Sequence, residues 1–198
     1  MIAMTKVIPI VCPGCNNPIF TKDRDEVILC TNCGTLHARN GKVTIIEYQV
    51  GAFKPGDGEK LYLPFWDLGV DFTIRSEQVE GGGFSKLAGF LKGNTNSGHL
   101  ELMLPAYEAD PYLYKDIAER LTFHMPVYTI GRFEAGVRRE PCAVTVDMTD
   151  EMADFMFVTI EAEKPGVMQK LDYDLKVTSR KLVYLPHYRK VNDVRPGY

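Results

Sequence analysis

Two C-x-x-C pairs near the N-terminus constrain this chain more than any other feature of its sequence. They lie in VCPGCNNPIFTKDRDEVILCTNCGTLH, residues 11–37, with fourteen residues between the pairs. Each pair can form a knuckle, a tight turn whose two thiolates converge on one point, and two knuckles can hold one Zn²⁺ ion tetrahedrally. The spacing therefore predicts a metal site. Its ligands would be Cys12, Cys15, Cys30 and Cys33.

The residues around the cysteines favour a small three-stranded ribbon, similar to rubredoxin, over residues 1–48. Two apolar pieces, residues 19–20 and 27–29, flank a polar turn at residues 23–26 and predict a hairpin that carries the knuckles. KVTIIEY, residues 42–48, is rich in β-branched side chains and predicts a third strand. A module of this size buries too little apolar surface to fold alone, so we expect the ion to be structural.

Zinc is the metal that we expect at this site. A four-cysteine site with a proline inside one knuckle also resembles the iron site of rubredoxin. Rubredoxins, however, have a longer gap between the knuckles and an aromatic-rich shell, where this chain has KDRDE. Iron is therefore the less favoured alternative. His37 follows Cys33 by four residues, but with four thiolates present we expect it to be an exposed strand residue.

Composition places the chain among folded proteins of a reducing compartment. Of its 198 residues, 45% are hydrophobic and 25% are charged, which is typical of a protein with a core. The fifth cysteine, Cys142, stands apart from the others and is expected to be a buried structural thiol. The sequence has no apolar run that could cross a bilayer and no recognisable secretory signal, so we expect a cytoplasmic protein.

Residues 49–60, QVGAFKPGDGEK, combine three glycines with a proline and predict a linker. Beyond it, residues 61–198 are predicted to form a mostly antiparallel α+β domain with about two helices. Apolar and polar residues alternate at 68–74 and 171–177, which is the pattern of half-buried strands. CAVTVDM, residues 142–148, predicts a shorter strand.

Two helices can be recognised in this domain. The first is predicted to begin at Asp110 as N-cap, with Pro111 at its first position. The second is predicted to begin at a Thr149 cap. Both carry an apolar stripe that we expect to face the core. The stripes are Leu113, Ile117 and Leu121 in the first helix, and Met152, Phe155, Met156 and Ile160 in the second.

A phrase with proline and aromatic residues recurs three times, as LYLPFW (61–66), LMLPAY (102–107) and LVYLPHY (182–188). Proline lacks the N–H of a ladder bond and belongs at a strand end or an exposed edge. One interpretation places three strands at equivalent positions of one sheet. The other is an internal duplication whose aromatic side chains line a groove for a ligand or partner. These side chains are Trp66, Tyr107 and Tyr188.

A double-knuckle ribbon followed by YLPFW, by LPAY before a helix and by a closing LVYLPHY resembles a group of prokaryotic zinc-ribbon proteins of unknown function. The ribbon of that group is like that of transcription factor IIB. The resemblance covers the ribbon well and the remaining residues only through these short phrases. It implies zinc bound by the four cysteines and transfers no catalytic residue.

The sequence contains no metalloprotease, serine-hydrolase or phosphate-loop motif. The leading hypothesis is therefore a non-enzymatic protein in which a structural zinc ribbon is joined to a domain that recognises another macromolecule, first of all a protein. An enzyme without a recognisable motif remains open. A third class, electron transfer through a rubredoxin-like iron site, follows from the iron alternative.

Nucleic-acid binding is a further hypothesis, because residues 176–198 carry a net charge of +5 and include tyrosines that could stack on bases. The other parts of the chain oppose it. The ribbon carries only +1, and residues 49–175 carry −9, which would repel phosphates. Phosphate attraction would have to come from the C-terminal tail alone.

Overall fold

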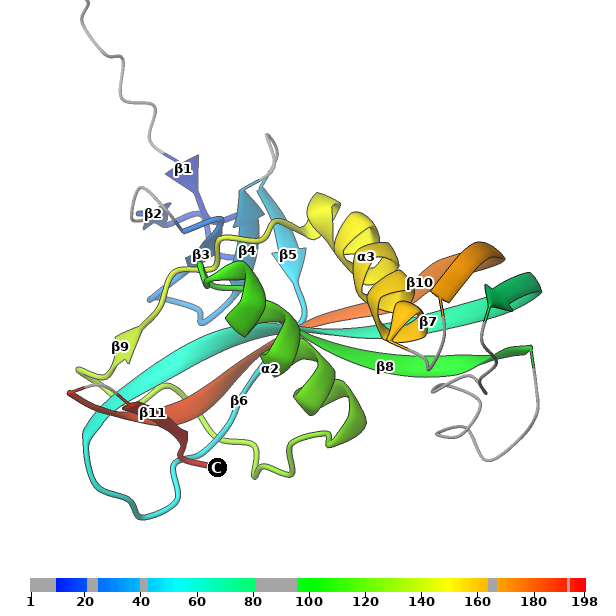
Figure 1. Cartoon of the computed structure of the whole chain (residues 1–198). Coiled ribbons are helices and arrows are strands. Elements are labelled where there is room, and N and C mark those ends of the chain that lie inside the picture. The colour runs from blue at the N-terminus through cyan, green and yellow to red at the C-terminus, as the bar shows by residue number, and fades with distance from the viewer. Residues whose placement is uncertain (1–9, 21–24, 40–42, 81–95, 164–166, 192) are drawn as a thin grey trace, which may run out of the picture.

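The computed structural model describes residues 10–20, 25–39, 43–80, 96–163, 167–191 and 193–198. Within them the chain forms an α+β fold with two helices and mostly antiparallel strands, as the sequence predicts. A group of small strands lies to one side of a long twisted sheet (Figure 1). The small strands are β1 (Ile10–Val11), β2 (Pro18–Ile19), β3 (Val27–Leu29), β4 (Leu36–Arg39) and β5 (Val43–Ile46).

The remaining elements belong to the long sheet or pack on it. In chain order they are β6 (Tyr48–Val50), β7 (Glu59–Glu80), β8 (Ser97–Pro105), α2 (Pro111–Phe123), β9 (Arg138–Arg139), the short 3₁₀ helix η1 (Val146–Met148), α3 (Thr149–Ala162), β10 (Val167–Lys190) and β11 (Asp193–Pro196).

The small strands form two separate hairpins rather than the single hairpin predicted. β1 pairs with β2, and β3 pairs with β4, so each cysteine pair has a hairpin of its own. The predicted pairing of residues 19–20 with 27–29 is therefore wrong. The predicted third strand is confirmed, since β5 pairs antiparallel with β4. The polar turn predicted at residues 23–26 lies partly outside the described residues, and Asp25 at its end is buried.

The long sheet is built around an antiparallel pair, β7 and β10, in the order β11-β10-β7-β8. Two short strands join it in parallel, β6 beside β10 and β9 beside β7. The predicted linker, residues 49–60, contributes to this sheet, because β6 includes residues 49–50 and β7 begins at Glu59. Its middle also contacts the C-terminus, where the Lys54 N–H donates to the Gly197 carbonyl (2.7 Å).

The recurring proline phrases all lie in this sheet. In β7 and β10 they pair reciprocally, with Tyr62 opposite Pro186, Leu63 opposite Leu185, and Pro64 opposite Tyr184. The Pro64 carbonyl accepts from Ala106 and that of Pro186 from Gly197, so the main-chain groups of both prolines point away from the β7–β10 ladder. Neither ring nitrogen therefore removes a ladder bond, and both strands continue through their prolines.

The two helices confirm one predicted cap and correct the other. The Asp110 side chain accepts from the N–H groups of Tyr112 (3.0 Å) and Leu113 (3.4 Å), so it caps α2 as predicted. Thr149 does not cap α3, because its hydroxyl donates to the Val146 carbonyl from inside the helix. The strand predicted at residues 142–148 is also wrong, since its last three residues form η1, capped by Thr145.

The predicted apolar stripes are buried only in part. Leu113 in α2 is 53% exposed and Phe155 in α3 is 55% exposed, whereas Leu121, Met156 and Ile160 are buried. In α2 the buried side includes the small residues Ala118 and Thr122, which allow close packing beside β8. The buried face of α2 is thus rotated about the helix axis away from the predicted stripe of large apolar side chains. In the described part of the chain, neither helix is long and apolar enough to cross a bilayer.

Candidate metal centre

Each cysteine pair lies in the turn of its own hairpin, and the two turns have the same backbone design. In the first, the Cys12 N–H donates to the Asn17 carbonyl (2.8 Å), and in the second the Cys30 N–H donates to that of Thr35 (2.9 Å). The residue after each pair has positive φ, 58° at Asn16 and 74° at Gly34. Glycine and asparagine tolerate this left-handed conformation best, which explains their presence there.

The two turns bring the four thiols together. One ligand atom from each of Cys12, Cys15, Cys30 and Cys33 lies within 4.8 Å of all the others. Cys12 Sγ is 3.6 Å from Cys33 Sγ, and Cys15 Sγ is 3.5 Å from Cys30 Sγ. A tetrahedron with metal–sulfur bonds of about 2.3 Å has edges of about 3.8 Å. The predicted ligands therefore have the spacing that a single metal ion requires.

Hydrogen bonds and burial set different proton affinities for these thiols. Burial raises the pKa of Cys12 to about 11. Hydrogen bonds from the side chain and backbone of Asn17 lower the pKa of Cys15 to about 6, and Thr35 lowers that of Cys33 in the same way. A bound Zn²⁺ ion requires all four as thiolates, so metal binding would release protons, above all from Cys12.

His37 lies beside the cysteines, and its predicted exposure is wrong. The side chain belongs to β4 but has no exposed surface, and its Nε2 lies 3.2 Å from Cys12 Sγ. The alternation of β4 explains this position. Leu36 and Ala38 face the hydrophobic core of the large sheet, so His37 between them faces the metal site. Period-two alternation around His37 was the sequence signal that could have revealed this.

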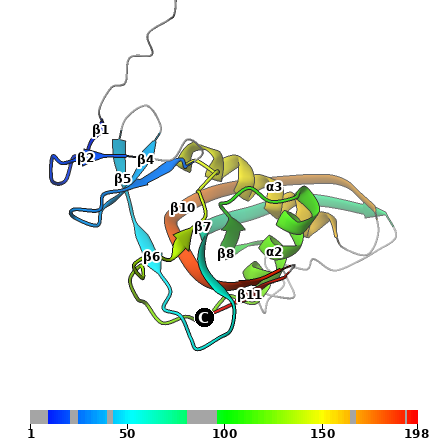
Figure 2. The ribbon, with the colours of Figure 1, turned by 90° about the vertical axis from the view of Figure 1, so that its left-hand side faces the viewer.

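The sheet β3–β5 thus separates the metal site from the rest of the protein. One face belongs to a small cluster with Cys12 and Cys30, to which Ile19 and Ile28 contribute. The other face belongs to the core that includes the side chains of the large sheet. Its members from the ribbon are Val27, Leu36, Ala38 and Ile46. Figure 2 shows the small strands together at one side of the large sheet, with β6 leading from them into it.

A polar contact at Asp25, which the sequence did not single out, fastens the ribbon to the larger domain. Its carboxylate accepts from Arg139 Nη2 (2.8 Å) and from the Cys142 N–H (3.0 Å). The Glu26 N–H donates in return to the Cys142 carbonyl (2.8 Å). Asp25 is only 3% exposed, and the Arg139 guanidinium also lies over the ring of Tyr184. The pair therefore closes a largely dry interface.

Cys142 itself is a buried thiol outside the metal site. It has no exposed surface, and its Sγ donates to the Val144 carbonyl (3.3 Å). Burial raises its pKa to about 12, so the reactive thiolate is disfavoured. These contacts support the structural role expected from the sequence.

The three aromatic residues proposed to line a groove lie in different environments. Trp66 has no exposed surface, and its Nε1 donates to the Val144 carbonyl (2.9 Å). Tyr107 packs edge-on against Phe65, which points to the opposite face of β7 from Trp66. Tyr188 is 8% exposed, and its hydroxyl donates to the Lys54 carbonyl (2.7 Å). The structure does not bring these three side chains together.

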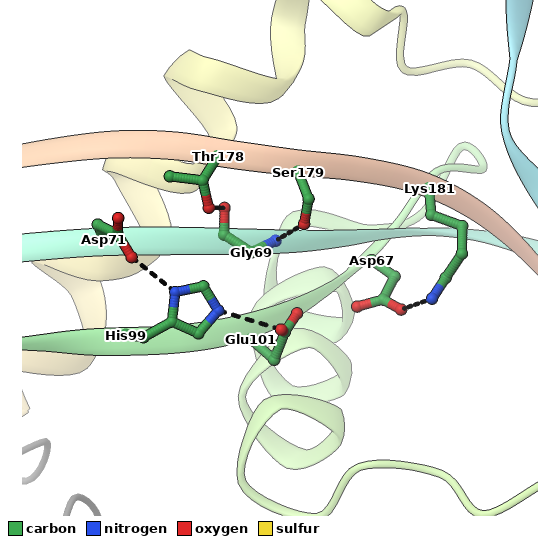
Figure 3. Close-up of polar contacts among 8 residues, drawn as sticks. All are labelled: Asp67, Gly69, Asp71, His99, Glu101, Thr178, Ser179 and Lys181. Atoms are coloured by element: carbon green, nitrogen blue, oxygen red, sulfur yellow. Dashed lines mark hydrogen bonds and ion pairs between the residues drawn. The ribbon is translucent and has the colours of Figure 1, made fainter.

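A second polar cluster lies where β7, β8 and β10 run side by side (Figure 3). His99 Nδ1 lies 2.7 Å from Asp71 Oδ1, and its Nε2 lies 3.1 Å from Glu101 Oε1. These carboxylates raise the pKa of His99 above its usual 6.5. Because both ring nitrogens face carboxylates, the protonated ring donates to both and neither is available to accept a substrate proton.

Across the described residues, the four cysteines are the one group of His, Cys, Asp and Glu side chains with ligand atoms spaced for a shared ion. The chain matches no protein-family model, no curated protein and no solved structure.

Proposed function

We propose that the protein binds one Zn²⁺ ion in a structural Cys₄ ribbon, and that its α+β domain, without catalysing a reaction, recognises another protein. The observation that carries the zinc proposal is the convergence of four thiols from two hairpins with tetrahedral spacing. Four protein ligands complete the coordination of zinc and leave no position for a substrate, which is typical of a structural site. The sequence resemblance to prokaryotic zinc-ribbon proteins favours the same assignment.

Metal analysis tests the zinc proposal. The purified full-length chain should contain one zinc ion per molecule and be colourless. Replacing Cys12 or Cys30 with serine should remove the ion. Cys142→Ser is the matched control, because Cys142 is equally buried but lies outside the quartet, and this variant should keep its zinc. A red protein with iron that bleaches on reduction would establish the electron-transfer alternative instead.

The larger domain offers a surface for an extended peptide beside α3. Of the described strands, none pairs with the outer edge of β10 before Leu182, since β6 and β11 pair only with later residues. A groove of about 760 Å³ runs along this edge. Its apolar lining is Phe155, Val158, Leu175 and Val177. An open strand edge beside a groove with side-chain pockets is how several domains bind extended peptides.

Affinity capture with two matched variants tests this role. A protein captured by the wild-type chain through this surface should no longer bind Phe155→Arg, because the charge would occupy the groove. It should still bind Tyr112→Arg, since Tyr112 is an exposed aromatic residue of the other helix. Partners lost equally from both variants, or from neither, would speak against recognition through the α3–β10 groove.

Nucleic-acid binding through the C-terminal tail is less favoured by the contacts of its cations. Arg189 pairs with Glu140 (2.9 Å), Lys190 with Asp57 (2.6 Å), and Arg195 with Asp193. The tyrosines of the tail are also poorly placed for stacking, because Tyr184 and Tyr188 are buried and the half-buried Tyr198 packs edge-on against His187. Salt-dependent binding of single-stranded DNA, weakened by Arg195→Gln, would restore this alternative.

A further inference from the structure

We propose that His37 donates a hydrogen bond from Nε2 to the metal-bound Cys12 thiolate and is thereby a positioning residue of the metal centre. This inference rests on the proposed zinc site. The Nε2–Sγ distance of 3.2 Å suits an N–H···S hydrogen bond. His37 and Cys12 both have no exposed surface, so water does not compete for either group.

Strand pairing holds the imidazole in this place. His37 lies in the central strand of the β3–β4–β5 sheet, opposite Ile28 on one side and Ile45 on the other. Its neighbours Leu36 and Ala38 are buried in the core on the opposite face. A strand anchored in this way cannot turn His37 away from Cys12 without moving two core side chains.

The burial of Cys12 explains why a donor is needed there. A thiolate removed from water loses its hydration and is costly unless hydrogen bonds or a cation replace it. Three of the four sulfurs contact a polar side chain, Cys15 that of Asn17 (3.5 Å) and Cys33 that of Thr35 (3.1 Å). These two sulfurs lie at more exposed positions. For the fully buried Cys12 the polar side chain is His37.

The direction of the bond follows from metal binding. A metal-bound thiolate has no proton to give, so the proton must belong to the imidazole. The other ring nitrogen, Nδ1, is buried and has no hydrogen-bond partner among the described residues. A proton on Nδ1 would leave that buried N–H unsatisfied and turn the Nε2 lone pair toward a negative sulfur. The Nε2–H tautomer avoids both penalties.

His37 does not itself replace a cysteine ligand. The group of ligand atoms that all lie within 4.8 Å of one another contains the four cysteines and excludes His37. It therefore lies in the shell that orients the ligands and tunes the metal. Removing such partners typically weakens metal affinity about 10- to 100-fold.

Nuclear magnetic resonance of the unchanged full-length chain gives the direct test. With ¹⁵N-labelled histidine and the site loaded with ¹¹³Cd²⁺, the ring proton of His37 should be on Nε2 and should couple to cadmium through the hydrogen bond. A proton on Nδ1 would overturn the proposal. Direct one-bond coupling between cadmium and Nε2 would also overturn it, since His37 would then be a ligand.

Variants supply a second test through metal affinity, measured by competition with a chelator. His37→Phe should bind zinc about 10- to 100-fold more weakly than wild type. His37→Gln places an amide N–H where Nε2 lies and should recover most of the affinity. His124→Phe, at the exposed C-cap of α2 and outside the cysteine group, should bind as wild type does.

The outcomes separate the two proposals. If the purified wild-type chain contains no metal, the proposed zinc-binding function itself is wrong. Wild-type chain with one zinc ion, together with full affinity in His37→Phe, would overturn only the role of His37. If His37→Phe does not fold, the position of the ring proton in the unchanged chain still decides whether His37 donates to Cys12.

Discussion

Asp25 of the ribbon and Arg139 of the larger domain form an ion pair with an O–N distance of 2.8 Å across an interface that leaves Asp25 only 3% exposed. The same carboxylate accepts a hydrogen bond from the Cys142 N–H, so the Asp25 side chain pairs with the Arg139 charge and also with a backbone donor. The ribbon is therefore held by specific polar contacts as well as by its apolar face.

Replacing Asp25 with asparagine should lower the free energy of unfolding by about 3 kcal/mol, because the Arg139 charge loses its partner in a poorly hydrated place. Urea denaturation measures this change. Asp57→Asn is the control, since the Asp57 carboxylate is 88% exposed and pairs with Lys190 on the surface. It should have little effect on the free energy of unfolding, because solvent screens the exposed pair. Equal effects of the two substitutions would show that the buried pair does not hold the ribbon.

Metal removal should release the ribbon while the large sheet stays folded. The β7–β10 ladder and the apolar cluster around Leu63, Phe65 and Leu185 do not involve the ribbon. After chelation, hydrogen exchange should become fast for the amides of β3–β5 and stay slow for the centre of β7 and β10. Simultaneous loss of protection in both regions would contradict separate stabilisation and make the ion a requirement of the whole fold.

The His99 cluster should make stability depend on pH. Asp71, followed by Glu101, raises the pKa of His99 above 6.5, so the folded state binds the proton more tightly than the unfolded state. This contribution is fully present below pH 6.5 and is lost as the pH rises through the folded pKa. His99→Gln should thus destabilise the protein at pH 5.5 and have little effect at pH 9. Since the side chain is half exposed, the difference should stay below about 1 kcal/mol.

An NMR titration of His99 checks the origin of this effect. Its pKa should lie above 6.5, the ordinary value of an imidazole. A folded-state pKa for His99 at or below 6.5 would remove the physical basis of the predicted pH dependence.

Gly69 should not tolerate a side chain, because it faces a bulge in β10. A Cβ at this position would lie 2.5 Å from Ser179 Oγ and 3.2 Å from His99 Cε1. The register shift between Val177 and Ser179 brings these groups close, and the Gly69 N–H donates to Ser179 Oγ (3.1 Å; Figure 3). Gly69→Ala should therefore destabilise the protein by about 1–3 kcal/mol in urea denaturation.

A double-mutant cycle identifies the clash. In a Ser179→Gly background the same alanine substitution should cost clearly less, with a coupling above about 0.5 kcal/mol. Strict additivity of the two substitutions would assign the loss to the backbone of the strand instead.

Local chemistry made the cysteine quartet, the Asp110 cap and the alternating strands predictable. A C-x-x-C turn, a cap and a period of two residues each depend on neighbours within a few positions. The burial of Trp66 was harder to foresee, because Leu61–Trp66 is apolar on both faces and has lost its alternation. The division into two hairpins was missed because propensity identifies strands but not their partners.

Long-range contacts account for the remaining differences. β6 finds its partner in residues 182–184, and Asp25 finds Arg139 at a separation of 114 residues. Neither segment carries a local signal of the other. His37 differs, because the alternation of Leu36 and Ala38 around it was a local signal of its inward position, although its contact with Cys12 from another hairpin is long-range.

The parallel pairing of β6 with β10 has a consequence for biosynthesis. All four cysteines leave the ribosome before any strand of the large sheet, so the ion can be captured while translation continues. Arg139 and β10 emerge much later, and until then the inner face of the small sheet lacks part of the core that it packs on. A nascent ribbon that binds a metal ion would therefore hold it before the sheet that completes its docking surface has been made.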